Sequence, residues 1–280
     1  MKRQKRSYRI FIIVLLAVFA LMALMPFVYL VVASLVEDMS QVFKNGLALD
    51  ITPDMLGTGN YRMLVTEQHG VFFRWFWNSV VVTAMFTVLS LATSSMVGYA
   101  VSVYRFRGRK IYIIMIMSTM MIPVEILMLP LYREMLSFRL LNTYLGVVLP
   151  FAVSSFAIYF FMQYAASLPR ELVDAARVDG CGEFAIFLKI MGPLMIPAFG
   201  SMGILQAMTA WNDFLWPLIV MSTNENFTLT VGLQTYLSPY GNNYNMLFAG
   251  AVISVIPLMI LFLCNQNAFI SGIMAGSVKG

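Results

Sequence analysis

Long uncharged runs alternate with short charged segments along this chain. The first run, Ile10–Val36, and the second, Trp75–Tyr104, contain no charged residue. A helix that crosses a bilayer needs about 20 apolar residues, and four later runs reach that length with at most one acid each. We therefore predict an all-α integral membrane protein with six transmembrane helices. They are expected at residues 10–36, 75–104, 111–132, 143–166, 196–221 and 246–270.

The distribution of basic residues gives this predicted bundle an orientation. When both termini are placed in the cytoplasm, 13 of the 18 basic residues lie on the cytoplasmic side, where Lys and Arg are normally enriched. Residues 1–9 hold five of them, and the apolar run that follows is too long for a cleaved secretory signal. We expect a cytoplasmic N-terminus at 1–9, a six-span domain at 10–270 and a cytoplasmic tail at 271–280.

The composition excludes several classes of function. The chain of 280 residues is 60% hydrophobic and only 11% charged, and its basic residues do not gather as a nucleic-acid site requires. His69 is the only histidine, and Cys181 and Cys264 lack the spacing of a metal site. A phosphate-binding GxxxxGK[ST] loop is also missing from the sequence. We expect no enzymatic activity, no metal and no cofactor held by this chain itself.

The charged segment at residues 169–195 lies between the fourth and fifth runs. Glu171 and Asp174 fit the first turn of a short helix, and Gly180 can adopt the left-handed conformation that ends one. A second helix is predicted from Glu183 to Ile190, before prolines that open the next run. Its apolar residues are expected on one face: Phe184, Phe187 and Leu188.

The spacing within this segment resembles the EAA motif, the cytoplasmic coupling loop of ABC importer permeases. That motif reads Glu-Ala-Ala, three residues, Gly, nine residues and Ile-x-Leu-Pro; here Asp174, Gly180 and Ile190 stand at the matching positions. Asp174 replaces the glutamate, and Gly192 replaces the leucine. By this resemblance, the coupling to an ATPase is carried by Glu171, Asp174, Ala175, Ala176, Arg177, Asp179, Gly180, Phe184, Ile190 and Pro193.

The resemblance extends over nearly the whole chain, including the Asn60-Tyr61 pair and Asn78–Val80. It indicates a carbohydrate ABC importer permease of the maltose-permease type, with the type I fold, in a bacterial inner membrane. The stretches DGCGEFAIFLKIMGPLMIPAFG and SPYGNNYNMLFAG are most similar to arabino-oligosaccharide importer permeases. The implied partners are a second homologous permease, two ATPase subunits that bind ATP and Mg, an extracytoplasmic sugar-binding protein and the lipid bilayer.

Two further segments resemble functional parts of that family. The tail resembles one that inserts between the ATPase subunits, although most chain ends simply fray; its residues are Gly276, Ser277, Val278, Lys279 and Gly280. An outer loop resembles one that probes the sugar pocket of the binding protein, although the same residues suit any interfacial turn. It offers aromatic rings and amides: Tyr236, Tyr240, Asn242, Asn243 and Tyr244.

Two acids fall within predicted spans, where charge is costly and often functional. Glu125 could line the pathway or pair with a basic residue. Asp213 lies beside Trp211 and Asn212 in a stretch that resembles the fifth span of sugar permeases, where helix packing is favoured over sugar contact. The alternative function is an ion-coupled secondary transporter with both acids as coupling sites, but the sequence lacks its repeated pair of broken helices. A membrane scaffold without transport activity is a third possibility.

Overall fold

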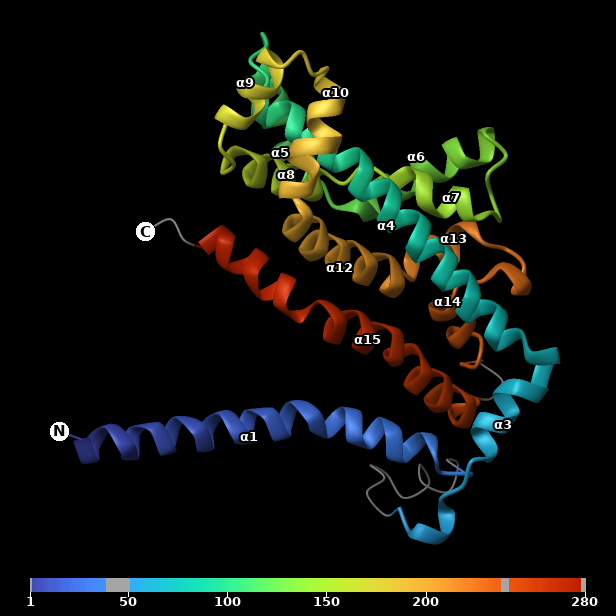
Figure 1. Cartoon of the computed structure of the whole chain (residues 1–280). Helices are drawn as coiled ribbons and strands as arrows, with labels where there is room; N and C mark the ends of the chain where they lie inside the picture. The colour runs from blue at the N-terminus through green and yellow to red at the C-terminus, as the bar shows by residue number, and fades with distance from the viewer. Residues whose placement is uncertain (1, 39–50, 238–241, 278–280) are drawn as a thin grey trace. The chain divides into compact units, whose positions relative to one another are not determined.

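The computed structural model describes residues 2–38, 51–237 and 242–277. Its regular elements are helices, with one isolated antiparallel bridge between Val36 and Leu56 (Figure 1). The prediction of an all-α protein is confirmed within these ranges. Three helices are long and apolar enough to span a membrane: α1 (Lys2–Ser34), α4 (Val71–Val103) and α15 (Tyr244–Ser277).

Further spans are made of bent helix pairs rather than single straight helices. The first pair is α5 (Arg109–Thr119) with α6 (Val124–Ser137), bent by 99°. The span predicted at 111–132 is therefore divided between two helices. Pro123 lacks a backbone N–H and disfavours helical geometry at the residue before it, so the helix ends before it and α6 begins after it. Because α6 continues to Ser137, it also includes part of the predicted outer link at 133–142.

The predicted fourth span is also divided. It consists of α7 (Tyr144–Val148), a short 3₁₀ turn η3 (Leu149–Phe151) and α8 (Ser155–Ala166), with a bend of 50°. The Ser154 side chain accepts the N–H of Ala157 at 3.3 Å and caps the start of α8. A third pair, residues 183–194 with 196–212, is bent by 80°, and if each bent pair is one span, the described residues contain up to six spans.

The predicted fifth span, 196–221, breaks at Asp213. Helix α12 (Ile196–Asn212) ends there, and α13 (Leu215–Val220) follows. A proline ring clashes with the carbonyl four residues earlier in a continuous helix, and for Pro217 that carbonyl belongs to Asp213. The freed carbonyl instead accepts the Thr230 hydroxyl at 2.7 Å.

The chain forms two compact units, residues 1–73 with 232–256 and residues 74–231 with 257–280. The remaining elements are mostly short. They are η1 (Pro53–Met55), α3 (Gly59–Thr66), η2 (Glu67–Gly70), α9 (Glu171–Val178), α10 (Glu183–Ile186), a π-helical turn η4 (Phe187–Met191), α11 (Gly192–Leu194), η5 (Asn224–Asn226) and α14 (Leu229–Gln234).

The first unit is joined at the end of α1 by the buried amide of Asn60. This amide donates to the carbonyls of Ser34 and Val36 at 2.9 and 2.7 Å, and its oxygen accepts the Asn245 amide at 3.0 Å. The Tyr61 hydroxyl lies 2.6 Å from that of Ser34. The Asn60-Tyr61 pair therefore connects α1, α3 and the start of α15, because it satisfies backbone groups that α1 leaves free at its end.

The second unit has an equivalent buried amide at Asn78, near the start of α4. It donates to the carbonyls of Glu225 and Phe227 at 2.8 and 2.9 Å and accepts the Tyr144 hydroxyl at 2.6 Å. Asn78 is 1% exposed. One side chain thus joins α4 to the start of α7 and to the loop that carries η5.

We predict that Asn78→Ala lowers the stability of the second unit by about 3 kcal/mol. Two carbonyls and one hydroxyl would lose their partner, and each unsatisfied buried group costs about 1–3 kcal/mol. Thermal unfolding in detergent measures the change. Asn212→Ala is the control, since among the described residues the exposed Asn212 amide bonds only the Met208 carbonyl of its own helix, at 2.8 Å. An equal Tm for the two variants would contradict the structural role of Asn78.

Candidate functional site

A glycine turn ends α9 at the point that the sequence indicates. The N–H of Gly180 bonds the Arg177 carbonyl at 3.0 Å, and the N–H of Cys181 bonds the Ala176 carbonyl at 3.0 Å. These two bonds form a Schellman motif, which requires a left-handed residue after the helix cap. Gly180 has φ of 78°, so its predicted left-handed conformation is confirmed.

The second predicted helix of this segment is not a continuous α-helix. Only α10 is regular, and it passes into the π-helical turn η4 and then α11. Pro193 has no N–H for the carbonyl four residues before it, whereas the N–H of Gly192 bonds the Phe187 carbonyl in the wider π pattern. A β-carbon at position 192 would lie 3.0 Å from that carbonyl oxygen, which favours glycine there.

This turn also changes the predicted apolar face. Phe187 is 6% exposed and packs inside, while Phe184 and Leu188 are exposed on the surface. Of the three residues expected on one apolar face, only Phe187 is thus buried, where the helix passes from α10 into the π turn. The described surface of the segment therefore carries apolar side chains beside its charges.

Arg177 organises the charged side chains of the segment. Its guanidinium donates to both carboxylate oxygens of Glu183, at 2.8 and 3.2 Å, and to Asp174 at 3.2 Å. It also lies 5.9 Å from the centre of the Tyr104 ring, whose hydroxyl donates to Glu183 at 2.7 Å. The network therefore connects α9 and α10 to the residue that follows α4.

The network gives one pH-dependent contribution to stability. The Arg177 guanidinium and then the Tyr104 hydroxyl hold the pKa of Glu183 below its ordinary value of 4.5. A carboxyl with a lowered pKa stabilises the fold above its unfolded value, and this contribution is lost as the pH falls through the folded value.

We predict a small Tm difference between the wild-type protein and Glu183→Gln at pH 7, because exposed ion pairs contribute little. The difference should disappear as the pH falls below 4.5. Thermal unfolding in detergent at several pH values measures it. Glu171→Gln changes a carboxyl of α9 outside this network and serves as the control. A difference that grows toward low pH would contradict the assignment.

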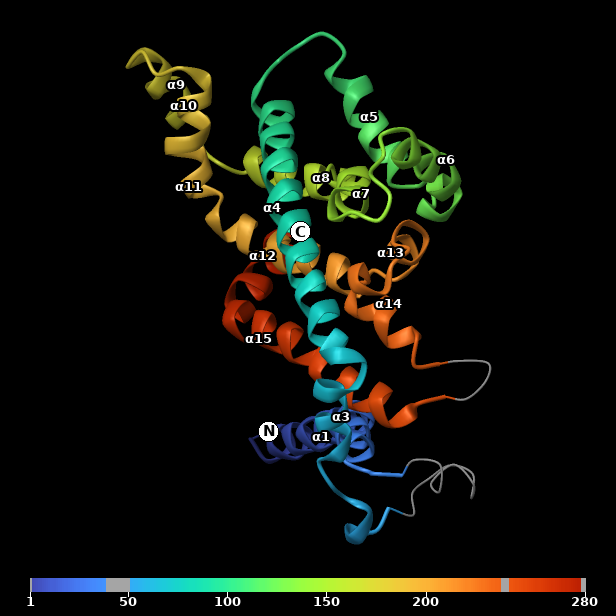
Figure 2. The same cartoon turned by 90° about the vertical axis from the view of Figure 1, so that its right-hand side faces the viewer.

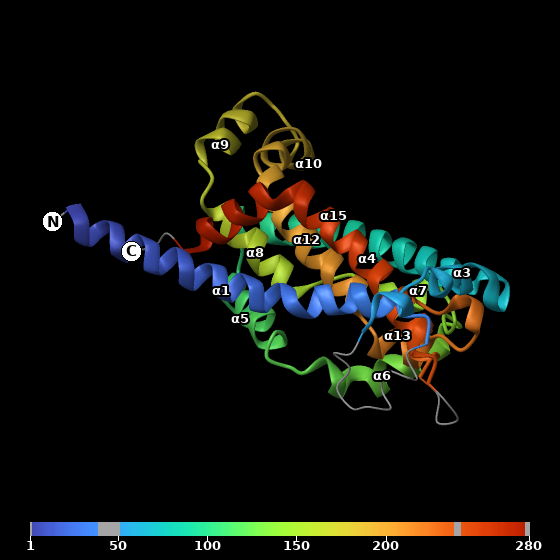
Figure 3. The ribbon, with the colours of Figure 1, turned by 90° about the horizontal axis from the view of Figure 1, so that it is seen from below.

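The inner face of α9 packs into a large apolar core. Val173 and Ala176 are 2% and 5% exposed, and they share this core with Tyr99 of α4, Phe161 of α8 and Met202 of α12. In Figures 1, 2 and 3, α9 and α10 project beyond α8 and α12. The segment is therefore anchored on one side and open on the other.

The candidate coupling residues are divided between the buried and the exposed side of the segment. Ala176 is buried, and Ile190 is half-buried against the same core. The other eight are exposed: Glu171, Asp174, Ala175, Arg177, Asp179, Gly180, Phe184 and Pro193. A protein that docks on this segment would meet charged, apolar and glycine positions together.

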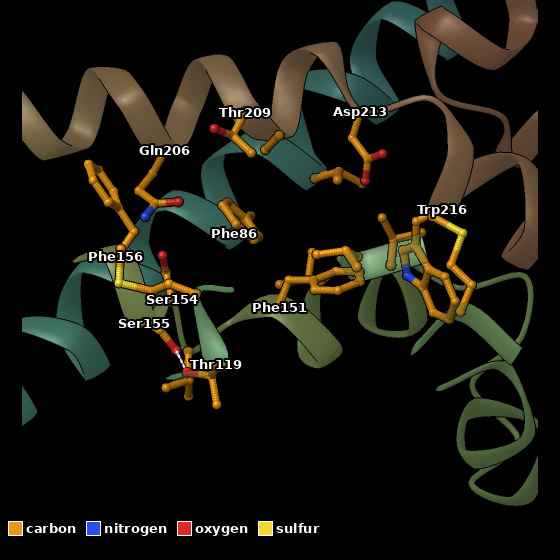
Figure 4. A pocket seen from close by; sticks show the side chains of 18 of the residues that line it. Phe86, Thr119, Phe151, Ser154, Ser155, Phe156, Gln206, Thr209, Asp213 and Trp216 are labelled. Carbon is orange, nitrogen blue, oxygen red and sulfur yellow. Dashed lines mark hydrogen bonds between the residues drawn. The ribbon is translucent and has the colours of Figure 1, made fainter. Parts of the chain in front are cut away.

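A cavity of about 570 Å³ lies within the second unit (Figure 4). Three helix breaks meet at it: residues 120–123, 152–154 and 213–214. Its lining combines aromatic rings with hydroxyl, amide and carboxyl groups; these residues include Phe86, Thr119, Phe151, Ser154, Ser155, Phe156, Gln206, Thr209, Asp213 and Trp216. The size and the mixed lining are typical of a small-molecule site.

The two acids of the predicted spans lie in different places. Asp213 lines the cavity, whereas Glu125 is exposed in the first turn of α6 and is not among the cavity's lining residues. Trp211 is buried, and its ring meets that of Phe76 edge to face at 5.6 Å. Asn212 is exposed. Of the candidate pathway residues, the structure thus brings only Asp213 to the cavity.

The outer-loop candidates have local structural roles. Tyr236 is 6% exposed, and burial raises its pKa to about 12. The Asn243 side chain accepts the N–H of Met246 at 3.1 Å and caps α15, while the Asn242 amide donates to the Tyr244 hydroxyl at 2.7 Å. Tyr240 lies outside the described residues, so its predicted role stays a prediction.

The tail candidates are described only in part. The backbone of α15 is helical through Gly276 and Ser277. Val278, Lys279 and Gly280 lie outside the described residues. Insertion of the tail between ATPase subunits therefore stays a prediction.

Sequence reasoning missed two polar features of the second unit. Gln206 and Thr209 line the cavity from one side of α12, together with Asp213 directly after the end of that helix. Their spacing of three and four residues was a readable signal. The bidentate contact between Arg177 and Glu183 was not readable, because it depends on the turn at Gly180.

Three comparisons connect this geometry to known proteins. The family model described as "Binding-protein-dependent transport system inner membrane component" matches residues 94–274. The chain is 48% identical to the arabinooligosaccharides transport system permease protein AraQ of Bacillus subtilis, over 98% of this chain and 96% of that protein. It is 37% identical to the lactose transport system permease protein LacG of Rhizobium radiobacter, over 73% and 74% of the two chains.

Among solved structures, one chain of a bacterial ABC transporter involved in the import of the acidic polysaccharide alginate superposes with a TM-score of 0.82. The two sequences are 26% identical, and the match covers 95% of this chain and 98% of the other.

Proposed function

This chain belongs to the family of inner membrane components of binding-protein-dependent transport systems, and we propose that its segment 169–195 couples it to ATPase subunits. The chain is the permease subunit of a sugar importer and has the type I ABC permease fold. The proposal concerns how this subunit receives the energy of ATP, which is bound with Mg²⁺ and hydrolysed by two separate partner subunits.

One observation carries the coupling proposal: α9 exposes its charged side and buries Val173 and Ala176 in a core shared with α12. Interiors of proteins are close-packed and transmit displacement rather than absorb it. A partner that moves α9 therefore also moves the buried part of α12, up to Met202. The next part of α12 lines the cavity at Gln206, and Asp213 lines it directly after the helix ends.

The proposed mechanism is alternating access. An extracytoplasmic sugar-binding protein delivers the sugar, and this chain forms the pathway with a second, homologous permease. Closure of the two ATPase subunits on ATP moves α9, and hydrolysis resets it. Both termini and segment 169–195 are placed in the cytoplasm, in a multi-pass arrangement in the bacterial inner membrane, because this orientation follows the distribution of basic residues.

The substrate proposed is an oligosaccharide, since a relative 48% identical is named for arabinooligosaccharides. The positions of the two acids do not support the alternative of an ion-coupled transporter. It required Glu125 and Asp213 to act as coupling sites, but only Asp213 lines the cavity. The family match points in the same direction.

Purification of the tagged chain from its native membrane in mild detergent tests the proposed function. We expect a second permease and an ATPase to purify with it, and the binding protein with sugar to stimulate ATP hydrolysis. Recovery of this chain alone, without ATPase activity, would contradict the proposal.

A further inference from the structure

A loop rich in basic residues joins α4 to α5. Residues 104–108 connect the two helices, and Lys110 lies in the first turn of α5. The exposed basic side chains of this stretch are those of Arg105, Arg107 and Lys110. In the part of the chain that the structure describes, these three side chains form no hydrogen bond or salt bridge. Residues 104–110, the basic loop, therefore present three positive charges that the fold itself does not use.

Two other side chains fix the basic loop in place. The Arg109 guanidinium donates to the carbonyls of Val101 and Ser102 at 2.7 and 3.3 Å. Carbonyls in the last turn of a helix lack a partner within it, so Arg109 caps the end of α4. At the start of the loop, the Tyr104 hydroxyl donates to Glu183 at 2.7 Å. The three unused charges therefore project from a loop that is held at both ends.

The position of these charges does not favour α5. The N-terminus of a helix carries a partial positive charge, so acidic side chains stabilise its first turn and basic ones do not. The first turn of α5 has no acidic residue, and Gly108 at its N-cap provides no side-chain cap. Lys110 therefore adds positive charge where the helix is already positive. The stability of α5 does not account for the basic loop.

The basic loop lies where the apolar surface of a span begins. The exposed residues that follow Lys110 include Ile111 and Ile114, at 64% and 60%. Phe106, within the loop, is 45% exposed. Because a chain extends by at most about 3.6 Å per residue, the connection at 104–108 reaches only about 10 Å beyond the helices that it joins. Basic and aromatic side chains at this level are typical of the lipid headgroup region.

The basic loop shares one end of the second unit with the coupling segment. In Figure 2, the connection between α4 and α5 lies at the same end as α9. The bond between Tyr104 and Glu183 joins the two directly. In the proposed orientation, this end faces the cytoplasm. Cytoplasmic leaflets carry anionic lipids, which attract basic residues near the membrane surface.

We propose that the basic loop docks on anionic phospholipid headgroups of the cytoplasmic leaflet. Arg105, Arg107 and Lys110 bind the headgroup phosphates, since guanidinium and ammonium groups are good partners of phosphate oxygens. Phe106 inserts its ring at the interface. The proposal rests on the orientation given by the proposed function and goes beyond it by naming a lipid partner.

Native mass spectrometry of the assembled importer tests this docking. The importer is purified in neutral detergent and titrated with dioleoylphosphatidylglycerol, which is anionic, or with zwitterionic dioleoylphosphatidylcholine. The parent should prefer phosphatidylglycerol, and added salt should reduce the preference. Arg105→Gln, Arg107→Gln and Lys110→Gln combined should weaken phosphatidylglycerol binding by at least about tenfold. Arg109 is kept, because it caps α4.

Two further variants separate the role of charge from other effects. The matched control removes three charges from exposed residues of the second unit outside the basic loop: Arg74→Gln, Arg133→Gln and Arg139→Gln. It should bind phosphatidylglycerol as the parent does. Arg105→Lys with Arg107→Lys keeps the charge and should also keep the binding. The proposal is overturned if the parent shows no preference, if the triple variant and the control bind equally well, or if the lysine variant loses binding.

ATPase activity and subunit composition, measured on the same preparations, separate this inference from the proposed function. Normal stimulation by the binding protein, together with unselective lipid binding, overturns the docking alone. Loss of the ATPase subunit from the triple variant, with phosphatidylglycerol binding intact, would assign the basic loop to that subunit and also overturn the proposal. A parent preparation without ATPase subunits or stimulated activity would contradict the importer assignment itself, whatever the lipid titration gives.

Discussion

Gly180→Asp is expected to reduce sugar uptake by at least about tenfold, which corresponds to a typical coupling free energy between two sites of 1–3 kcal/mol. Gly180 is exposed in the turn after α9, with φ of 78°, and a side chain there is strained by about 1–2 kcal/mol. Apart from its chain neighbours, no described residue has an atom within 4 Å of the β-carbon that the change would add, so the fold has room for it. The variant should assemble and hydrolyse ATP, but lose stimulation by the binding protein.

Gly182→Asp is the matched control for this variant. Gly182 has an ordinary φ of −68° and equally open surroundings, so the same charge enters two residues away without backbone strain. We expect uptake to fall much less than in Gly180→Asp. Uptake of labelled sugar and stimulated ATPase activity are measured for both. Wild-type uptake with normal stimulation in Gly180→Asp would refute our interpretation of the turn.

Gly98→Ala is expected to lower the stability of the second unit. A β-carbon at position 98 of α4 would lie 2.7 Å from the carbonyl oxygen of Ile158 and 2.8 Å from the backbone nitrogen of Met162. Both neighbours are backbone atoms of α8, so neither can move aside without shifting the helix. Overpacking of this kind costs about 1–3 kcal/mol, and small residues at such crossings let membrane helices approach closely.

Gly203→Ala on α12 provides the comparison, since its β-carbon would meet only the Leu91 side chain, at 3.5 Å, an ordinary contact. Thermal unfolding in detergent and the yield of assembled importer are the measurements. We expect a lower Tm and a lower yield for Gly98→Ala only. Equal values for the two variants would show that α4 and α8 do not approach as closely as described.

The sequence predicts those features that depend on local chemistry. The left-handed turn at Gly180 and the helix class follow from residue type, spacing and apolar run length, and the structure confirms both. Run length alone could not show that predicted spans divide near Pro123 and Pro217. The π turn at Phe187–Met191 was also hidden, because it results from a slip of one hydrogen bond between Gly192 and Phe187.

The sequence predicted the coupling segment but not the cavity. The coupling segment was found because its motif is contiguous, whereas the cavity draws on four separate stretches of the chain that meet only after the helices bend. Asp213 was noticed for its charge, but the uncharged Gln206 was not. The spacing of Gln206 and Thr209 was readable in the sequence, but only the folded helices show that both residues line a cavity.

Cross-linking through Cys181 tests the central claim most directly, namely that segment 169–195 docks on an ATPase subunit. Cys181 is exposed and directly follows Gly180, so Cys264→Ser leaves one reactive thiol at the proposed contact. In inverted membrane vesicles, a bismaleimide should link Cys181 to the ATPase subunit, and ATP should change the yield. A thiol that reacts with an impermeant maleimide only from the outside of intact cells, or that yields no cross-link to the ATPase, would contradict the account.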